Sequence, residues 1–236
     1  MAKGPLYKRL LKLFLIKLPL AFIALSVLWV LILRWVPVYL TPLMISRSIE
    51  YSSDGDFHTY KKWKSIEDIS PELAKAVIAS EDNLFAEHNG FDWNEMRKAI
   101  NEHKTKGKRL RGASTISQQT AKNVFLFPSR SFVRKGFEAY FTVLIEWLWS
   151  KERILEVYLN VAEMGKGIYG AEAAAQEIFG KAASELTRRE ASLIAACLPN
   201  PLQRNAGKPS AYVTKRAGQI RNLIPKIAYP EWIGQE

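Results

Sequence analysis

Glu81–Asp92, which reads Glu-Asp-Asn-Leu-Phe-Ala-Glu-His-Asn-Gly-Phe-Asp, is the stretch that decides the fold and the chemistry of this chain. Leu73 and Val77 precede it at helical spacing, so the carboxylate of Glu81 emerges from the buried stripe of a predicted helix. Burial raises the pKa of a carboxylic acid toward the range that suits a general base. The spacing alone favours a second interpretation, in which Glu81 is a helix-terminal carboxylate in an ion pair.

A second stretch, Gly112–Asn123, reads Gly-Ala-Ser-Thr-Ile-Ser-Gln-Gln-Thr-Ala-Lys-Asn. Thr115 with Gln118 three residues later is a capping box, which predicts that a helix begins here. The unpaired backbone N–H groups of the first turn, with Gln118 and Lys122 on one face, predict an anion site for a pyrophosphate or a sugar hydroxyl. A solvated polar face is the alternative for Gln118 and Gln119.

Three further segments carry charge or glycine. Arg134, Lys135 and Glu138 lie within one helical turn, where the residues alone predict an ordinary surface ion pair. The basic run 104–111 is either a solvated loop or a flap near anionic phosphates and lipid headgroups. The glycine-rich segment 160–170 lies between predicted helices, so we expect it to shape a cleft.

The soluble part of the chain is predicted to be mainly α. Ser70 as N-cap and Pro71 at the first helical position begin one helix. Others are expected over 92–101, from Thr115, over 132–162, 168–179, 187–198 and 211–227, and convincing alternating strands are absent from the sequence.

The N-terminus carries a predicted membrane anchor. Leu18–Leu33 contains no charged residue, Lys17 and Arg34 flank it, and Trp29 and Trp35 suit a membrane interface. The expected organisation is a basic cytoplasmic segment (1–17), a transmembrane helix (18–36) and a catalytic domain (37–236) on the outer side of the cytoplasmic membrane, by the positive-inside rule. A cleaved signal peptide is the alternative. We expect the apolar segment 36–45, which contains two prolines, to lie along the outer leaflet.

Charge and composition exclude several classes of protein. The net charge is +11, but residues 1–47 hold seven of the 34 basic residues and no acidic one, so the remaining 27 face 23 acidic residues. A basic groove for nucleic acid is therefore not expected. The three histidines are not spaced as a metal cluster, no glycine-rich nucleotide loop occurs, and the single cysteine, Cys197, is expected in the core.

Together with 151–160, 170–180 and 190–201, these stretches resemble in order and spacing the motifs of the peptidoglycan glycosyltransferases, glycosyltransferase family 51. The resemblance covers residues 37–230 and is closest to the monofunctional biosynthetic members, since no Ser-x-x-Lys of a transpeptidase occurs. It departs from the family pattern at Ala113, where a second glycine is usual, and at Phe137, where a basic residue is frequent.

The resemblance implies a lysozyme-like domain and an inverting transferase that polymerises lipid II into β-1,4-linked glycan strands and releases undecaprenyl pyrophosphate. Glu81 would be the base and Glu138 the second functional carboxylate, with Mg²⁺ or another divalent cation as a candidate cofactor and no organic cofactor. The implied substrate-binding residues are Asp82, Phe85, His88, Ser114, Thr115, Gln118, Gln119, Lys122, Asn123, Arg130, Arg134, Lys135 and Asn160. Of these, we expect His88, together with Asp92, to pin the loop rather than to react.

Two other functions stay open. A membrane-anchored lytic transglycosylase would also use two carboxylates, but it has no pyrophosphate to neutralise, so the cations near Lys122 and Arg134 favour the transferase. A non-catalytic scaffold of the cell-wall machinery has no need of both Glu81 and Glu138. The expected partners are lipid II, the growing lipid-linked glycan, membrane lipids and other cell-wall synthesis or division proteins.

Overall fold

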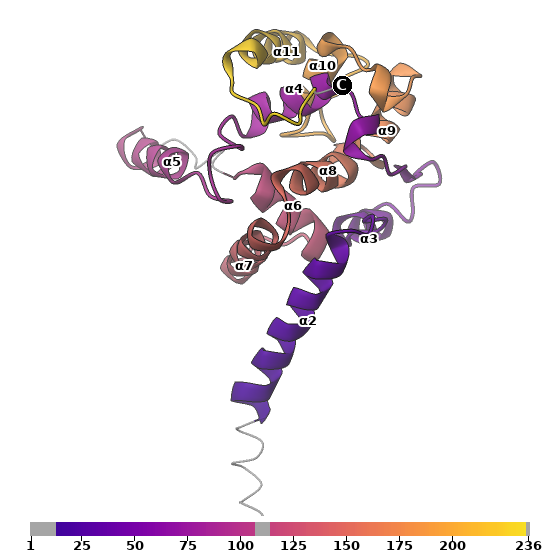
Figure 1. Cartoon of the computed structure of the whole chain (residues 1–236). Helices are drawn as coiled ribbons and strands as arrows, with labels where there is room; N and C mark the ends of the chain where they lie inside the picture. The colour runs from indigo at the N-terminus through magenta and orange to yellow at the C-terminus, as the bar shows by residue number, and fades with distance from the viewer. Residues whose placement is uncertain (1–12, 107–113, 235–236) are drawn as a thin grey trace, which may run out of the picture. The chain divides into compact units, whose positions relative to one another are not determined.

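The computed structural model describes residues 13–106 and 114–234, and the chain divides into two units, Met1–Val36 and Pro37–Glu236 (Figure 1). In the first unit a π-helical turn, η1 (Leu13–Lys17), continues into α2 (Leu18–Leu33). An 18-residue window within these 21 residues has a mean hydropathy of 2.4, and the helix is long and apolar enough to cross a membrane. The helix ends three residues before the predicted boundary at Val36, and a turn leads to Pro37, which disfavours helical backbone at Val36.

The second unit is mainly helical, as predicted. Its longer helices are α3 (Pro42–Glu50), α4 (Pro71–Glu81), α5 (Trp93–Lys106), α6 (Ile116–Phe125), α7 (Phe132–Leu148), α8 (Lys151–Val161), α10 (Arg188–Cys197) and α11 (Ala211–Leu223). Shorter helical pieces are η2 (Ile66–Asp68), α9 (Ala171–Ala174), η3 (Ala175–Phe179), η4 (Ala183–Glu185) and η5 (Ile224–Lys226).

Two groups of helices form the core of this unit. One comprises α4, α10 and α11, and the other comprises α6, α7 and α8 (Figure 1). Leu73 and Ile194 are fully buried in the first group, and Ile116, Ile145 and Leu155 are fully buried in the second. Cys197 is buried, as expected. Because α4 ends at Glu81, next to α6, the stretch Glu81–Asp92 connects the two groups of helices.

Several helix boundaries differ from the prediction. The expected helix over 132–162 is two helices, because Ser150 accepts a hydrogen bond from the Arg153 N–H at 3.1 Å and begins α8. The second predicted helix does not end at Asn101, since α5 continues to Lys106. The last helix ends at Leu223, and the 3₁₀ turn that follows contains Pro225.

The start signals of two helices behave differently. Thr115 and Gln118 form the predicted capping box of α6. Ser70 occupies the N-cap position of α4, but its hydroxyl donates to the Leu186 carbonyl at 2.7 Å instead of capping the helix. Pro71 at the first position therefore begins α4 without a side-chain cap, and Ser70 ties it to the start of α10.

The structure has no long alternating strand among its described residues, as predicted, but it does contain three very short strands. β1 (Tyr60–Lys61), β2 (Glu163–Gly165) and β3 (Ile168–Tyr169) form a sheet in the order β1-β3-β2, with β1 parallel and β2 antiparallel to β3. Strands of two or three residues are too short to show an alternating pattern. They also displace the start of the helix expected at Ile168, which begins only at Ala171 after Gly170.

Gly170 explains part of the glycine content of 160–170. Its φ is +82°, and a Cβ at this position would lie 2.6 Å from the carbonyl oxygen of Asn160. Only glycine combines this backbone conformation with such close contact. The segment therefore brings β2 and β3 back against the end of α8.

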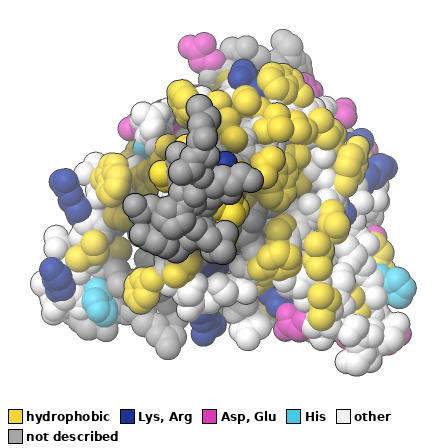
Figure 2. Space-filling model, turned by 90° about the horizontal axis from the view of Figure 1, so that it is seen from below, with side chains coloured by type: hydrophobic (Ala, Val, Ile, Leu, Met, Phe, Trp, Pro, Cys, Tyr) yellow, Lys and Arg dark blue, Asp and Glu magenta, His cyan; other side chains and the backbone are white. Residues whose placement is uncertain are grey.

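Large apolar side chains are exposed on the second unit as well as on the anchor, and hydrophobic side chains are prominent on the face that Figure 2 shows. Those of the second unit include Leu40 before α3, Ile49 on α3, and Phe132, Val133 and Trp147 on α7. Within the predicted outer-leaflet segment, Tyr39 and Leu40 are exposed whereas Val38 and Met44 are buried.

Candidate active site

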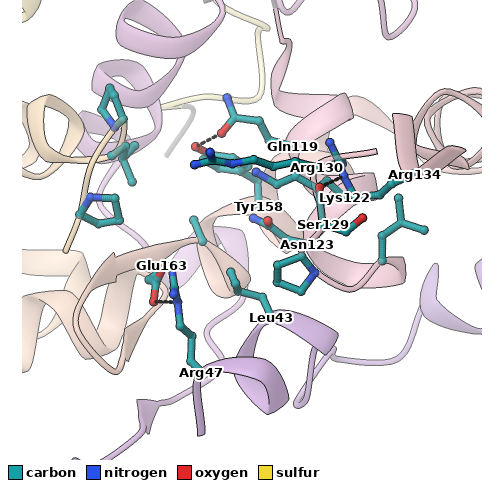
Figure 3. A pocket seen from close by; sticks show the side chains of 16 residues that line it. Leu43, Arg47, Gln119, Lys122, Asn123, Ser129, Arg130, Arg134, Tyr158 and Glu163 are labelled. Carbon is teal, nitrogen blue, oxygen red and sulfur yellow. Dashed lines mark hydrogen bonds and ion pairs between the residues drawn. The ribbon is translucent and has the colours of Figure 1, made fainter. Parts of the chain in front are cut away.

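A cavity of about 510 Å³ lies between α3, α6, the start of α7, the end of α8 and the turn after α10 (Figure 3). A smaller cavity of about 220 Å³ lies at the end of α4, beside the starts of α5 and α6. The larger cavity is lined by Leu43, Arg47, Gln119, Lys122, Asn123, Leu126, Pro128, Ser129, Arg130, Arg134, Tyr158, Ala162, Glu163, Leu198, Pro199 and Pro201.

Gln119 connects the two cavities. Its Nε2 donates to Glu81 Oε2 at 2.9 Å, and its Oε1 accepts a hydrogen bond from the Tyr158 hydroxyl at 3.3 Å. Gln119 and Tyr158 line the larger cavity, whereas Glu81 lines the smaller one. The orientation of the amide is thus determined from both ends, and the carboxylate of Glu81 keeps its second oxygen for other contacts.

The surroundings of Glu81 suit a proton acceptor. Burial raises the pKa of Glu81, and the hydrogen bond from Gln119 and the charges of Arg216 and Lys122 oppose this shift. Arg216 lies on α11, a helix to which the sequence assigned no functional residue. A buried carboxylate at a helix C-terminus, with one amide donor, holds a proton more strongly than an exposed one.

Four cations line the larger cavity: Arg47 on α3, Lys122 on α6, Arg130 in the loop before α7, and Arg134 on α7. Burial lowers the pKa of Lys122, and among the neighbouring charges Glu138 opposes this most strongly. Phe137, three residues after Arg134 on α7, contributes no cation to the cavity wall. Such a wall suits a phosphate-bearing group, whose negative charge needs positioned cations.

Glu138 organises this wall from behind. Its side chain is 3% exposed; Oε2 accepts from Arg134 Nη1 at 2.6 Å, and Oε1 accepts from Lys135 Nζ. Arg134 Nε also donates to the Ser129 carbonyl at 2.6 Å. Glu138 and Lys135 therefore do not line the cavity, and Glu138 acts on it through Arg134.

The predicted anion site at the start of α6 is occupied by a residue of the chain itself. Asp82 Oδ2 accepts from the Ile116 N–H at 2.9 Å, and Asp82 Oδ1 lies 2.8 Å from His88 Nε2. Because His88 Nδ1 accepts from the Gly90 N–H at 3.1 Å, Nε2 carries the proton and donates to Asp82. The carboxylate of Asp82 thus links the stretch Glu81–Asp92 to the stretch Gly112–Asn123. His88 holds the loop in place, as expected.

Gln118, which was predicted to share a ligand-binding face with Lys122, lines neither cavity. Gln118 is 3% exposed, and its Oε1 accepts from the Thr115 N–H at 3.0 Å, which completes the capping box. Thr115 also donates from its hydroxyl to the Gly90 carbonyl at 2.7 Å. The cap uses Gln118, and the next residue, Gln119, faces the cavity instead.

Phe85 and Asn160, predicted to bind substrate, lie away from both cavities. Phe85 is fully buried, with Lys151 Nζ 4.7 Å from its ring centroid. Asn160 is also buried, and its amide bonds the backbone N–H and carbonyl of Lys64, each at 2.8 Å. Both side chains pack the protein around the site. His88, Gln118, Lys135 and Glu138 line neither cavity. The other predicted residues do: Glu81, Asp82, Ser114 and Thr115 line the smaller one, and Gln119, Lys122, Asn123, Arg130 and Arg134 line the larger one.

Comparison with known proteins agrees with this geometry. Residues 50–224, well over half of the chain, match the family model described as Transglycosylase. The chain belongs to the transglycosylase family. A relative from Bacteroides thetaiotaomicron is 59% identical over 210 residues, which are 87% of this chain and 84% of the relative. Relatives from Bdellovibrio bacteriovorus and Stutzerimonas stutzeri are each 51% identical, covering 92% of this chain and 89% and 94% of their own. All three are named biosynthetic peptidoglycan transglycosylase.

The structure of this transglycosylase adds site residues that the sequence did not indicate. Tyr158 lies within the segment 151–160, which resembles a family motif, but the sequence assigned no role to this residue. Arg47 and Glu163 line the cavity as an ion pair, with Nε and Oε1 3.1 Å apart. They are separated by 116 positions, so no local pattern pairs them.

The surroundings of Glu138 do not fit a divalent cation bound to its carboxylate. Both carboxylate oxygens of Glu138 are bonded to cationic side chains. Within residues 13–106 and 114–234, no group of three or more His, Cys, Asp or Glu side chains is arranged to hold a metal ion. Ala113 and most of the basic run 104–111 lie outside the described residues, so the structure does not address those two predictions.

Proposed function

We propose that this transglycosylase polymerises lipid II into β-1,4-linked peptidoglycan strands with inversion at the donor sugar, releasing undecaprenyl pyrophosphate. The observation that carries the proposal is the pair of adjoining cavities, with the proton acceptor Glu81 in one and four cations in the other, linked by Gln119. The names of the relatives support the substrate class.

In this reaction Glu81 takes the proton from the 4-hydroxyl of the acceptor sugar as that oxygen attacks C1 of the donor. The bond between C1 and the phosphate oxygen breaks on the opposite face, and the electron pair leaves with the pyrophosphate. Lys122, Arg130 and Arg134 neutralise the charge that develops on the leaving group. The proton on Glu81 then passes to solvent, which restores the base.

The cations distinguish this reaction from lytic cleavage of a glycan. A lytic transglycosylase needs a carboxylic acid near the scissile oxygen but has no pyrophosphate to neutralise. Glu138, buried behind Arg134 and Lys135, supports this wall and does not form a second reacting carboxylate in the cavity.

We place the catalytic domain on the outer side of the cytoplasmic membrane, with the N-terminus in the cytoplasm. The support is the apolar helix Leu13–Leu33, the basic residues before it, and the exposed apolar side chains near α3 and on α7. A reporter that is active only outside the cytoplasm, fused after Glu236, is expected to be active. Protection of the C-terminus from protease in spheroplasts contradicts this orientation.

The activity is tested with the purified full chain in detergent and labelled lipid II. We expect polymer that a muramidase digests, and none with Glu81→Gln at equal protein. The same protein is incubated with preformed peptidoglycan, from which the proposal predicts no release of fragments. Folded wild-type protein that forms no polymer, or that releases fragments instead, contradicts the proposed function.

A further inference from the structure

Arg47 is a fourth cation of the larger cavity and lies on a different wall from the other three. Figure 3 shows Arg47 joined to Glu163 on one side of the cavity, with Lys122 and Arg134 on the other. The proposed reaction leaves this ion pair without a role. Leu43, one helical turn before Arg47, lines the same cavity, so α3 presents an apolar side chain and a cation on one face.

The guanidinium of Arg47 is held in place but not fully used. Nε and Nη2 donate to the two oxygens of Glu163 at 3.1 and 3.3 Å, and Nη1 donates to Glu50 Oε2 at 2.6 Å. Arginine has five N–H groups, so two of them have no protein acceptor among the described residues. A paired guanidinium with remaining donors is suited to contact phosphate oxygens.

The two carboxylates that hold Arg47 differ in exposure. The side chain of Glu163 is 9% exposed, whereas that of Glu50 is 53% exposed. Burial raises the pKa of Glu163, whereas the charge of Arg47 and the hydrogen bonds from Arg47 lower it. Arg47 therefore favours the ionised form of the Glu163 carboxylate. The exposed pair with Glu50 is screened by water and weak, so an anion in the cavity can replace Glu50 at Nη1.

We infer that Arg47 is a further diphosphate-binding residue, which contacts the pyrophosphate of a polyprenyl-linked donor from the α3 wall. Glu163 keeps the guanidinium oriented, and Glu50 is the carboxylate that the phosphate displaces. The apolar Leu43 beside Arg47 suits a ligand in which an apolar chain adjoins an anionic head. The inference rests on the proposed function, because it takes the larger cavity as the donor site.

The test measures binding of farnesyl pyrophosphate, a short polyprenyl pyrophosphate, to the full chain in neutral detergent by calorimetry. We expect Arg47→Gln and Lys122→Gln each to weaken binding by about tenfold, the effect of one charge-assisted contact. Glu50→Gln is expected to tighten binding by about threefold, because it removes the competing carboxylate of a weak surface pair. Farnesol, which has no charge, should bind all three variants equally.

The matched controls come from a second arginine–glutamate pair outside the cavity. Arg188 Nη2 donates to Glu72 Oε1 at 3.0 Å, and neither residue lines the larger cavity. Arg188→Gln and Glu72→Gln change the net charge as Arg47→Gln and Glu50→Gln do, and we expect them to leave the binding constant unchanged. Melting temperatures of all variants show whether the fold is kept.

The outcomes separate this inference from the proposed function. If Lys122→Gln weakens binding and Arg47→Gln does not, Arg47 is structural only and the inference is wrong, while the donor site stands. If wild-type protein shows no saturable binding, or Lys122→Gln has no effect either, the donor site itself is wrong. If Arg47→Gln weakens binding only to phosphatidylglycerol micelles, Arg47 contacts membrane headgroups and the inference is overturned. Should Arg47→Gln unfold the protein, Glu50→Gln still decides, since absence of tightening contradicts displacement.

Discussion

Glu81 is half-buried and Glu138 is buried, and the surroundings of the two carboxylates are opposite. Glu81 ends α4, lines a cavity and receives a hydrogen bond from a neutral amide, that of Gln119. Glu138 lies within α7, lines neither of the two functional cavities and receives bonds from Arg134 and Lys135. Burial alone therefore does not assign a role to a carboxylate. A neutral donor leaves Glu81 able to take a proton. The two cationic donors use both carboxylate oxygens of Glu138, which makes it a support for the cationic wall.

The largest effect is expected for Glu81→Gln, which keeps the shape of the side chain and removes the basic oxygen. Polymerisation of lipid II should fall by at least about a hundredfold, the usual contribution of a general base. The measurement is the initial rate with protein whose melting curve shows that it is folded. Substantial residual activity in folded protein rejects Glu81 as the base.

A smaller loss, about tenfold, is expected for Glu138→Gln, because Arg134 and Lys135 lose the anion that positions them. The two variants should also differ in their response to pH. Burial raises the pKa of Glu81, so the wild-type and Glu138→Gln rates should fall on acidification at a higher pH than an ordinary carboxyl group would cause. Glu81→Gln should lack that limb and lose less activity at alkaline pH, where the acceptor hydroxyl ionises more easily. Identical pH–rate profiles for the two variants contradict the division of roles.

Asp82→Asn tests the contact between the two functional stretches. The amide of asparagine cannot accept from both the Ile116 N–H and His88 Nε2, and it removes the negative charge at the start of α6. We expect the free energy of unfolding to fall by about 1–2 kcal/mol. Urea unfolding measures the change, and Asp54→Asn, at an exposed ion pair with Lys166, is the control with little expected effect.

The smallest effect concerns the stability of Glu81→Gln. Because folding raises the pKa of Glu81, the favourable contribution of its protonated form is complete below the unfolded pKa and is lost as pH rises through the folded one. Near pH 8 the variant should therefore melt at a temperature about 2–4 °C higher than wild type. The difference should disappear near the ordinary carboxyl pKa of about 4.3. A variant that is less stable at alkaline pH indicates that ionised Glu81 stabilises the fold.

Secondary structure followed the sequence where the signal was local. The start of α4 at Pro71 and the capping boxes at Thr115 and Thr187 are contained in four or fewer consecutive residues. The prediction failed where the helical spacing of apolar residues continues past the end of a helix, as at Ser150 between α7 and α8. The sequence also did not indicate β1, whose partner β3 lies far along the chain.

The sequence by itself determined the apolar anchor, the mainly helical domain, the carboxylate at Glu81 and the cations around Lys122 and Arg134. Each of these depends on composition or on residues within a turn or two of one another, which helical geometry places predictably. The tertiary structure alone decided that Asp82 occupies the start of α6, 34 positions away, and that Arg47 meets Glu163 across 116 positions. It also decided that Gln119 and not Gln118 faces the cavity, since the direction of α6 is set by the helices against which it packs. Contacts of that kind depend on the relative placement of whole helices, which no local pattern encodes.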